Sequence, residues 1–124
     1  MKILFLIILL ILFYKPKKSK IPKVIFQTSK NKIPKYVTEK IKKKTLGWEY
    51  HYFSDKDIIK FFEKYPLKQF PNIIEKFNYL NNGAHKADLF RYYYLYIKGG
   101  VFIDSDAILE KNIDYIIKNY SFVS

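Results

Sequence analysis

Two Asp-x-Asp triplets are the residues of this 124-residue sequence whose type and spacing most clearly indicate chemistry. Asp104-Ser105-Asp106 follows the apolar run Val101-Phe102-Ile103, with only a small serine between its carboxylates. Two carboxylates at the end of a buried strand are unfavourable unless a cation or hydrogen-bond donors meet them. Hard oxygen ligands of this kind suit Mg²⁺ or Mn²⁺ that completes its shell with water and phosphate. The triplet by itself does not establish a cation site at Asp104 and Asp106, but the helix that precedes it supplies a context that favours one.

The other triplet, Asp55-Lys56-Asp57, is typical of a helix start. A lysine separates its carboxylates, and Ser54 stands directly before it. Serine is a preferred N-cap residue, and acidic residues in a first helical turn complement the helix dipole. We expect Asp57 to lie in solvent in the first turn of a helix and to have no part in metal binding.

Asp88 and Arg91 are three residues apart within the helical pattern Ala84–Lys98, so they share a helix face. The spacing alone favours a surface ion pair worth less than about 1 kcal/mol. The alternative is that the helix presents both side chains to a sugar diphosphate. In that case the arginine would bind hydroxyl or phosphate oxygens, and the aspartate would bind sugar hydroxyls.

The elements that must position these residues alternate between strands and helices, which predicts an α/β fold. We expect strands at 24–28, 48–53 and 101–103, helices at 36–44, 55–65, 72–79 and 84–98, a helical turn at 114–119 and extended chain at 121–124. Ligands of α/β sheets bind beyond the carboxyl ends of the strands. Gln27-Thr28 and Asp104-Ser105-Asp106 both stand at such ends.

The composition excludes several functions. The absence of cysteine rules out disulfides, cysteine-ligated zinc and thiol catalysis. The formal net charge is +12, but Arg91 is the single arginine among the 23 basic residues. Because base readout and bidentate phosphate recognition favour arginine, we expect no specific nucleic-acid partner.

Residues 1–20 form a separate segment with a hydrophobic run and a basic linker. Ile3–Tyr14 is an unbroken apolar and aromatic run of twelve residues, followed by Lys15, Lys17, Lys18 and Lys20. As a helix it would span about 18 Å, against roughly 30 Å for a hydrocarbon core. No small-residue cleavage site follows the run, which favours an uncleaved, single-pass signal anchor. A cleaved signal and a helix lying on the protein remain open, as does the orientation.

Several blocks of the sequence together resemble the glycosyltransferase family known as the sugar-binding region containing the DXD motif. The blocks are Ala87-Asp88-Leu89-Phe90-Arg91-Tyr92 with Leu95-Tyr96, then Gly99-Gly100-Val101-Phe102-Ile103-Asp104-Ser105-Asp106, and upstream Ile21–Thr28, Trp48-Glu49-Tyr50 and Ser54-Asp55. Yeast-type Golgi mannosyltransferases and lipid glycosyltransferases belong to this family, and clostridial glucosylating toxins share the pattern more distantly. The resemblance covers about residues 21–110.

The resemblance implies a GT-A-like, Rossmann-type sheet with flanking helices, a UDP- or GDP-linked sugar donor, Mn²⁺ or Mg²⁺, and retention of anomeric configuration. It implies that Asp106 binds the metal directly, and that Asp104 reaches the metal or the ribose through water. Asp88 and Arg91 would hold the donor sugar as catalytic residues, and Gln27 and Thr28 would line the nucleotide site. The sugar would pass to a hydroxyl of a glycan or lipid acceptor. The hydrophobic run at 3–14 would attach the enzyme to a membrane, Golgi- or ER-like in a eukaryotic cell.

The chain ends eighteen residues after Asp106. Family members generally continue with a region that supplies the acceptor site and usually another metal ligand or phosphate-binding group. We therefore expect residues 21–124 to be a partial glycosyltransferase domain that lacks the C-terminal part of the fold. The alternative function is a membrane-anchored basic binding module, or an inactive glycosyltransferase fragment, without catalysis.

Overall fold

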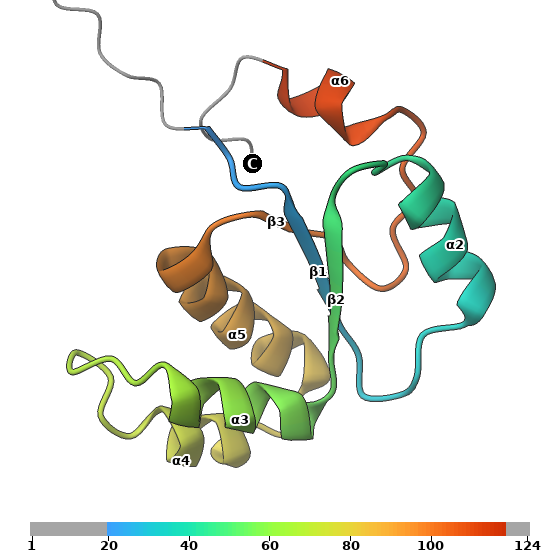
Figure 1. The fold of residues 1–124 in the computed structure, drawn as a ribbon. Helices are drawn as coiled ribbons and strands as arrows, with labels where there is room; N and C mark the ends of the chain where they lie inside the picture. Colours follow the sequence, from blue (N-terminus) through green and yellow to red (C-terminus); the bar gives the residue numbers. More distant parts are fainter. Residues whose placement is uncertain (1–19, 119–124) are drawn as a thin grey trace, which may run out of the picture.

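A computed structural model of the chain describes residues 20–118 (Figure 1). The hydrophobic run at 3–14 and the extended segment expected at 121–124 lie outside the described residues. The elements in chain order are β1 (Val24–Thr28), α2 (Lys35–Lys43), β2 (Glu49–Phe53), α3 (Asp55–Lys64), α4 (Ile73–Tyr79), α5 (Gly83–Lys98), β3 (Val101–Phe102) and α6 (Ile113–Ile117). Between residues 20 and 118 no helix has the length and apolar character needed to cross a membrane.

The three strands form one parallel sheet in the order β2-β1-β3. Val24 pairs with Glu49 at one end of the β1–β2 ladder and Thr28 pairs with Phe53 at the other, while Phe26 pairs with Phe102 of β3. The chain therefore leaves β1 towards one neighbour and returns on its other side. A switch point of this kind, between the carboxyl ends of β1 and β3, is where α/β sheets bind ligands. The expected α/β class is confirmed.

Helices cover both faces of the sheet, because successive side chains of a strand point to opposite sides. Phe26 packs on the face covered by α3, α4 and α5, where its ring centroid is 4.1 Å from that of Tyr94. Ile25 packs on the other face, with Ile41 of α2 and Ile113 of α6. Figure 1 shows these two groups of helices on opposite sides of the strands. Both layers are held by apolar burial around a small sheet.

The start of β3 is built on two glycines. Gly99 ends α5 with φ of 68°, and Gly100 has φ of 102°, a region that side chains rarely adopt. A Cβ atom on Gly100 would lie 2.7 Å from the carbonyl oxygen of Val24. The two glycines thus allow the chain to turn out of α5 and lie directly against β1, which aligns β3 and the Asp104-Ser105-Asp106 motif with the sheet.

Replacing Gly100 with alanine is expected to destabilise the fold by about 3 kcal/mol, from backbone strain and from the clash with Val24. Gly83→Ala is the matched control, because a Cβ there meets no atom within 4 Å. That variant should stay within about 1 kcal/mol of the parent, on the stabilising side. Urea unfolding of both variants measures the difference, and equal midpoints would contradict the close approach described here.

Candidate functional site

A surface hollow of about 340 Å³ lies at the carboxyl ends of β1 and β3. The first turns of α3 and α5 complete its wall. Its lining residues are Thr28, Ser29, Lys30, Asp55, Ile58, Asn81, Gly83, Ala84, Lys86, Ala87, Phe102, Asp104, Ser105 and Asp106. Carboxylates, lysines and helix amino ends thus meet at the switch point of the sheet.

A larger depression of about 650 Å³ lies beside α4 and the connection between α3 and α4. Its lining is mostly apolar, and its charged members are Glu63 and Glu75. It contains no strand end. We place the functional site at the smaller hollow, because that is where the sheet geometry and the polar side chains coincide.

Asp104 and Asp106 lie at the carboxyl end of β3, where the sheet gives way to a turn. Ile103 is the last buried residue before them, and both aspartates are exposed. The Ala107 amide closes the turn on the Asp104 carbonyl at 3.0 Å. Within residues 20–118, neither carboxylate forms an ion pair or a hydrogen bond. Two free carboxylates two residues apart are therefore available to a ligand.

These carboxylates fit the divalent cation that the sequence predicts. Mg²⁺ and Mn²⁺ accept oxygen ligands and are commonly bound through one or two carboxylates together with water and substrate phosphates. No set of three or more His, Asp or Glu side chains gathers into a metal cage within the described part of the chain. Asp104 and Asp106 can supply two ligands, so a cation held here would take the others from a bound phosphate and from water.

The Gln27 side chain supports this site by binding the backbone of Asp104. Its side chain is fully buried, and its amide nitrogen donates to the Asp104 carbonyl at 3.1 Å. Its amide oxygen accepts from the Tyr50 hydroxyl at 2.7 Å. Burial raises the pKa of the Tyr50 phenol, which keeps it a donor at neutral pH. Thr28, the next residue, lines the hollow directly, whereas Gln27 does not.

Asp88 and Arg91 form an ion pair on α5, with 2.9 Å between Nη2 and Oδ1. Neither residue lines the hollow. The guanidinium lies 5.3 Å from the centre of the Phe102 ring, and Phe102 does line it. The Phe102 ring therefore contacts both Arg91 and the hollow. The structure thus contains the ion pair that the spacing alone favours and places that pair beside the predicted site.

Asp55 and Lys86 are polar residues of the hollow that the sequence did not assign to it. Lys86 Nζ lies 3.4 Å from Asp55 Oδ2 and 4.8 Å from the centre of the Phe77 ring. The lysine side chain is 22% exposed, so the pair is partly shielded from water. The signal that could have found Asp55 is its place in the chain. It begins α3 directly after β2, and the helix that follows a parallel strand starts at the carboxyl edge of the sheet.

Asp57, in contrast, caps α3 as expected. Its carboxylate accepts from the Ser54 amide at 3.0 Å and from the Ser54 hydroxyl at 2.7 Å, and its own amide donates to that hydroxyl at 3.3 Å. This is a complete capping box. Asp57 does not line the hollow.

The cap makes a pH-dependent contribution to stability. Hydrogen bonds from the Ser54 amide and hydroxyl lower the pKa of Asp57. A carboxyl whose pKa is lower in the folded state stabilises the fold above its unfolded pKa and loses that effect as pH falls through the folded pKa. Asp57→Asn should therefore cost at most about 1 kcal/mol at pH 7. Thermal melts should show that the difference in melting temperature between the parent and Asp57→Asn disappears below about pH 4. A difference that persists at low pH would contradict this account.

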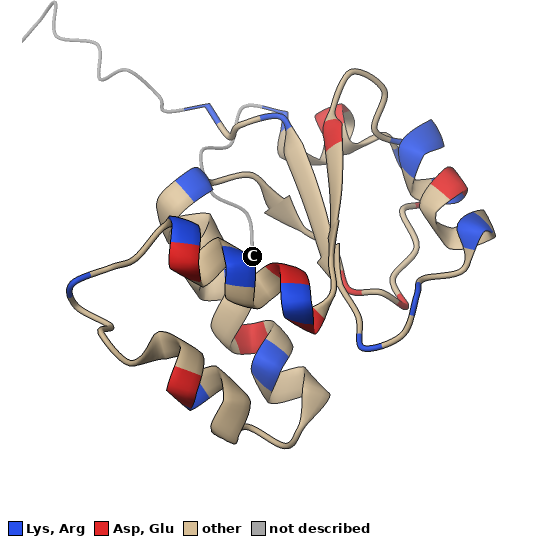
Figure 2. Cartoon of the chain, turned by 60° about the horizontal axis from the view of Figure 1, so that its bottom comes forward, with Lys and Arg blue, Asp and Glu red and all other residues tan. Residues whose placement is uncertain are grey.

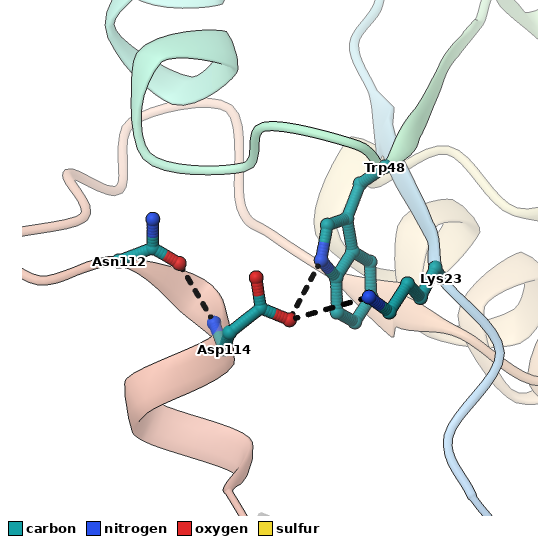
Figure 3. Close-up of polar contacts among 4 residues, drawn as sticks. All are labelled: Lys23, Trp48, Asn112 and Asp114. Atoms are coloured by element: carbon teal, nitrogen blue, oxygen red, sulfur yellow. Dashed lines mark hydrogen bonds and ion pairs between the residues drawn. The ribbon is translucent and has the colours of Figure 1, made fainter.

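The segment after Asp106 returns to the other end of the sheet and is fastened there (Figure 3). Asp114 accepts from the Trp48 indole at 3.1 Å and lies 4.0 Å from Lys23 Nζ. Asn112 caps α6 by accepting from the Asp114 amide at 3.0 Å. The loop that carries Asp106 is thus held by Gln27 at one end and by Asp114 at the other.

These observations define an α/β protein with a hollow lined by three aspartates and two lysines at the switch point of a parallel sheet. Comparison with known proteins identifies its family. The chain belongs to the family described as glycosyltransferase sugar-binding region containing DXD motif, whose model matches residues 23–123.

The chain is also similar to the initiation-specific alpha-1,6-mannosyltransferase of Saccharomyces cerevisiae, with 36% identity over 67 residues. The aligned region is 54% of this chain and spans 14% of the yeast protein. No solved structure matches the chain significantly. The resemblance stated from the sequence motifs is therefore confirmed at the level of the family.

Proposed function

We propose that the chain binds a UDP- or GDP-linked sugar together with Mn²⁺ or Mg²⁺ and transfers the sugar, with retention, to a hydroxyl of a glycan or lipid. The observation that carries the proposal is the meeting of two free carboxylates with the carboxyl end of β1 and the first turn of α5 around one hollow. Membership of the DXD family and the similarity to a yeast mannosyltransferase support it.

The proposed reaction needs a diphosphate leaving group and an electron-poor anomeric carbon to be stabilised together. A divalent cation, when bound, neutralises charge on the leaving phosphate. Asp104 and Asp106 would hold that cation, and Thr28 would contact the nucleotide at the end of β1. Gln27 donates to the Asp104 carbonyl and so holds the backbone from which the Asp104 carboxylate extends.

Asp88 and Arg91 are proposed to bind the donor sugar. Their ion pair orients both side chains on one face of α5, next to Phe102. The carboxylate would accept hydrogen bonds from sugar hydroxyls, and the guanidinium would donate to sugar or phosphate oxygens. Lys86, in the first turn of α5, lines the hollow, and its pair with Asp55 keeps it at the wall. We propose attachment to a membrane through residues 3–14.

Isothermal titration of the chain with UDP- and GDP-sugars, with and without Mn²⁺, tests this function. We expect one nucleotide sugar to bind in a manner that requires the cation, with binding lost on chelation by EDTA. A folded sample that binds no nucleotide sugar in either condition would refute the proposal. Release of nucleoside diphosphate, beyond the release that accompanies hydrolysis to free sugar, when a glycan or lipid acceptor is added then reports whether this chain also catalyses the transfer.

A further inference from the structure

The starts of the three parallel strands form an edge of the sheet opposite the hollow, which we call the amino edge. The Glu49 amide at the start of β2 donates to the Lys23 carbonyl at 3.0 Å. Gly99, before β3, is so close to Pro22 that a Cβ atom on it would lie 2.9 Å from the proline ring. These contacts bring the entry of the chain into β1 together with the ends of the helices that run back across the sheet.

Lysines gather at this amino edge. They come from the entry to β1 and from the carboxyl ends of α2, α3 and α5, and they are Lys20, Lys23, Lys43, Lys44, Lys64 and Lys98. Asp114 lies 4.0 Å from Lys23, and Glu49 at the start of β2 and Glu63 in the last turn of α3 are further acids of this edge. Figure 2 shows blue segments where the chain enters β1 and at the end of α5, and red segments near the carboxyl ends of the strands. At the amino edge the lysines of the described residues outnumber the acids.

Two of these lysines crowd around one aromatic ring. Lys98 Nζ lies 4.0 Å and Lys64 Nζ 5.4 Å from the centre of the Tyr65 ring. Hydrogen bonding from Lys98, together with the charges of Lys64 and Lys98, lowers the pKa of the Tyr65 phenol. Each ammonium group is attracted to the face of the ring, so Tyr65 holds two positive charges at this edge.

Helix dipoles explain only part of the charge. Lysines in the last turns of α2, α3 and α5 complement the dipoles of those helices. Lys20 and Lys23 precede a strand, where no helix dipole acts on them. Leu46, in the turn between α2 and β2, is 72% exposed on the same edge. Leu46 thus adds one apolar side chain to this basic edge.

We propose that the amino edge lies against an anionic lipid bilayer, with the hollow facing away from it into solvent. The chain enters β1 at this edge, directly after the basic linker and the apolar run Ile3–Tyr14. Lysine, as a compact charge on a flexible stem, suits the diffuse negative charge of a membrane better than paired recognition of single phosphates. This arrangement would leave the hollow open to solvent while the domain is attached to the membrane.

Site-specific labelling tests this orientation, because the chain contains no cysteine. Leu46→Cys and, as the control at the opposite edge, Asn81→Cys are each labelled with an environment-sensitive fluorophore in the full chain. The proteins are reconstituted into phosphatidylcholine vesicles with or without phosphatidylserine, and headgroup-attached quenchers are added. We expect the label at position 46 to be quenched several-fold more than the label at 81, in the phosphatidylserine vesicles only.

Charge variants complete the test. Lys20→Gln, Lys43→Gln and Lys98→Gln, combined, should abolish quenching at position 46. The matched triple Lys56→Gln, Lys60→Gln and Lys76→Gln removes the same charge from α3 and α4 and should leave the quenching intact. The proposal would be overturned if the label at position 46 were quenched equally in neutral and phosphatidylserine vesicles, or less than the label at 81. It would also be overturned if both triple variants lost quenching equally, or if the protein did not associate with vesicles. The proposal would likewise be overturned if the first triple variant lost RNA binding but kept the quenching at position 46. None of these readouts requires a nucleotide sugar, so they are independent of the proposed activity.

Discussion

Asp106→Asn is expected to abolish the stabilisation that Mn²⁺ and a nucleoside diphosphate confer on this protein. A ligand present at 100 times its Kd stabilises the folded state by about 2.7 kcal/mol. The variant removes one of the two carboxylates that are free to bind a cation at the end of β3. Melting temperatures of parent and variant, each with and without Mn²⁺ plus UDP or GDP, measure the loss directly.

The same variant should keep the stability of the metal-free protein or raise it slightly. Asp104 and Asp106 are exposed like charges within one turn, and no cation of residues 20–118 pairs with either. Removing one of the two charges relieves their repulsion. The result therefore distinguishes a metal-binding residue from a structural one. If Asp106 held the loop together, the metal-free variant would melt at a lower temperature than the parent.

Asp57→Asn is the matched control for this experiment. Asp57 also ends an Asp-x-Asp triplet, but its carboxylate is engaged by Ser54 in the capping box of α3. The variant should lose a little stability at neutral pH and respond to Mn²⁺ and nucleotide like the parent. If Asp106→Asn also responds like the parent, the assignment of Asp106 to the metal is wrong.

The order of helices and strands could be predicted from the sequence because local signals agree with the fold. Ser54 and Asp57 predict the start of α3, and the structure has the complete capping box there. The segment Val24–Thr28 is predicted as a strand, and the structure gives β1 the same bounds. The third strand is shorter than expected and ends at Phe102, because Ile103 retains a single ladder-like bond, to Phe26, before the chain turns.

The side-chain arrangement of the site could be predicted only in part, because it depends on contacts between distant residues. Gln27 and Asp104 are 77 residues apart in the chain, and nothing local indicates that the glutamine amide would bind the Asp104 backbone. Asp55 and Lys86 are 31 residues apart. A helix-capping pattern describes Asp55 and Asp57 alike, yet the direction of the first turn sends Asp57 back to Ser54 and leaves Asp55 at the hollow.

The second large effect is expected at Arg91. Arg91→Lys keeps the positive charge but removes the planar guanidinium that lies over both the Phe102 and Tyr92 rings. A lysine cannot present two parallel donors, so it would lose the contacts proposed to the donor sugar. Charge-assisted hydrogen bonds are worth about 1.5–3 kcal/mol, so we expect the affinity for a nucleotide sugar to fall by about tenfold or more.

The measurement compares two ligands that differ only in the sugar. Parent and Arg91→Lys are titrated with a nucleotide sugar and with the corresponding nucleoside diphosphate, both in Mn²⁺. Because Arg91 is proposed to act on the sugar, the variant should bind the diphosphate nearly as the parent does and lose only the increment that the sugar adds. Asp88→Asn should show the same selective loss, since its carboxylate orients the guanidinium at 2.9 Å.

Tyr92→Phe is the control that separates sugar binding from packing. The Tyr92 hydroxyl lies 3.3 Å from Arg91 Nη2, so this variant removes a neighbour of the guanidinium without touching its pair with Asp88 or its contact with Phe102. Tyr92 is 66% exposed, so its loss should leave folding and sugar affinity within a few-fold of the parent. Equal losses in Tyr92→Phe and Arg91→Lys, or a loss of diphosphate binding in Arg91→Lys, would show that Arg91 supports the helix surface and not the donor sugar.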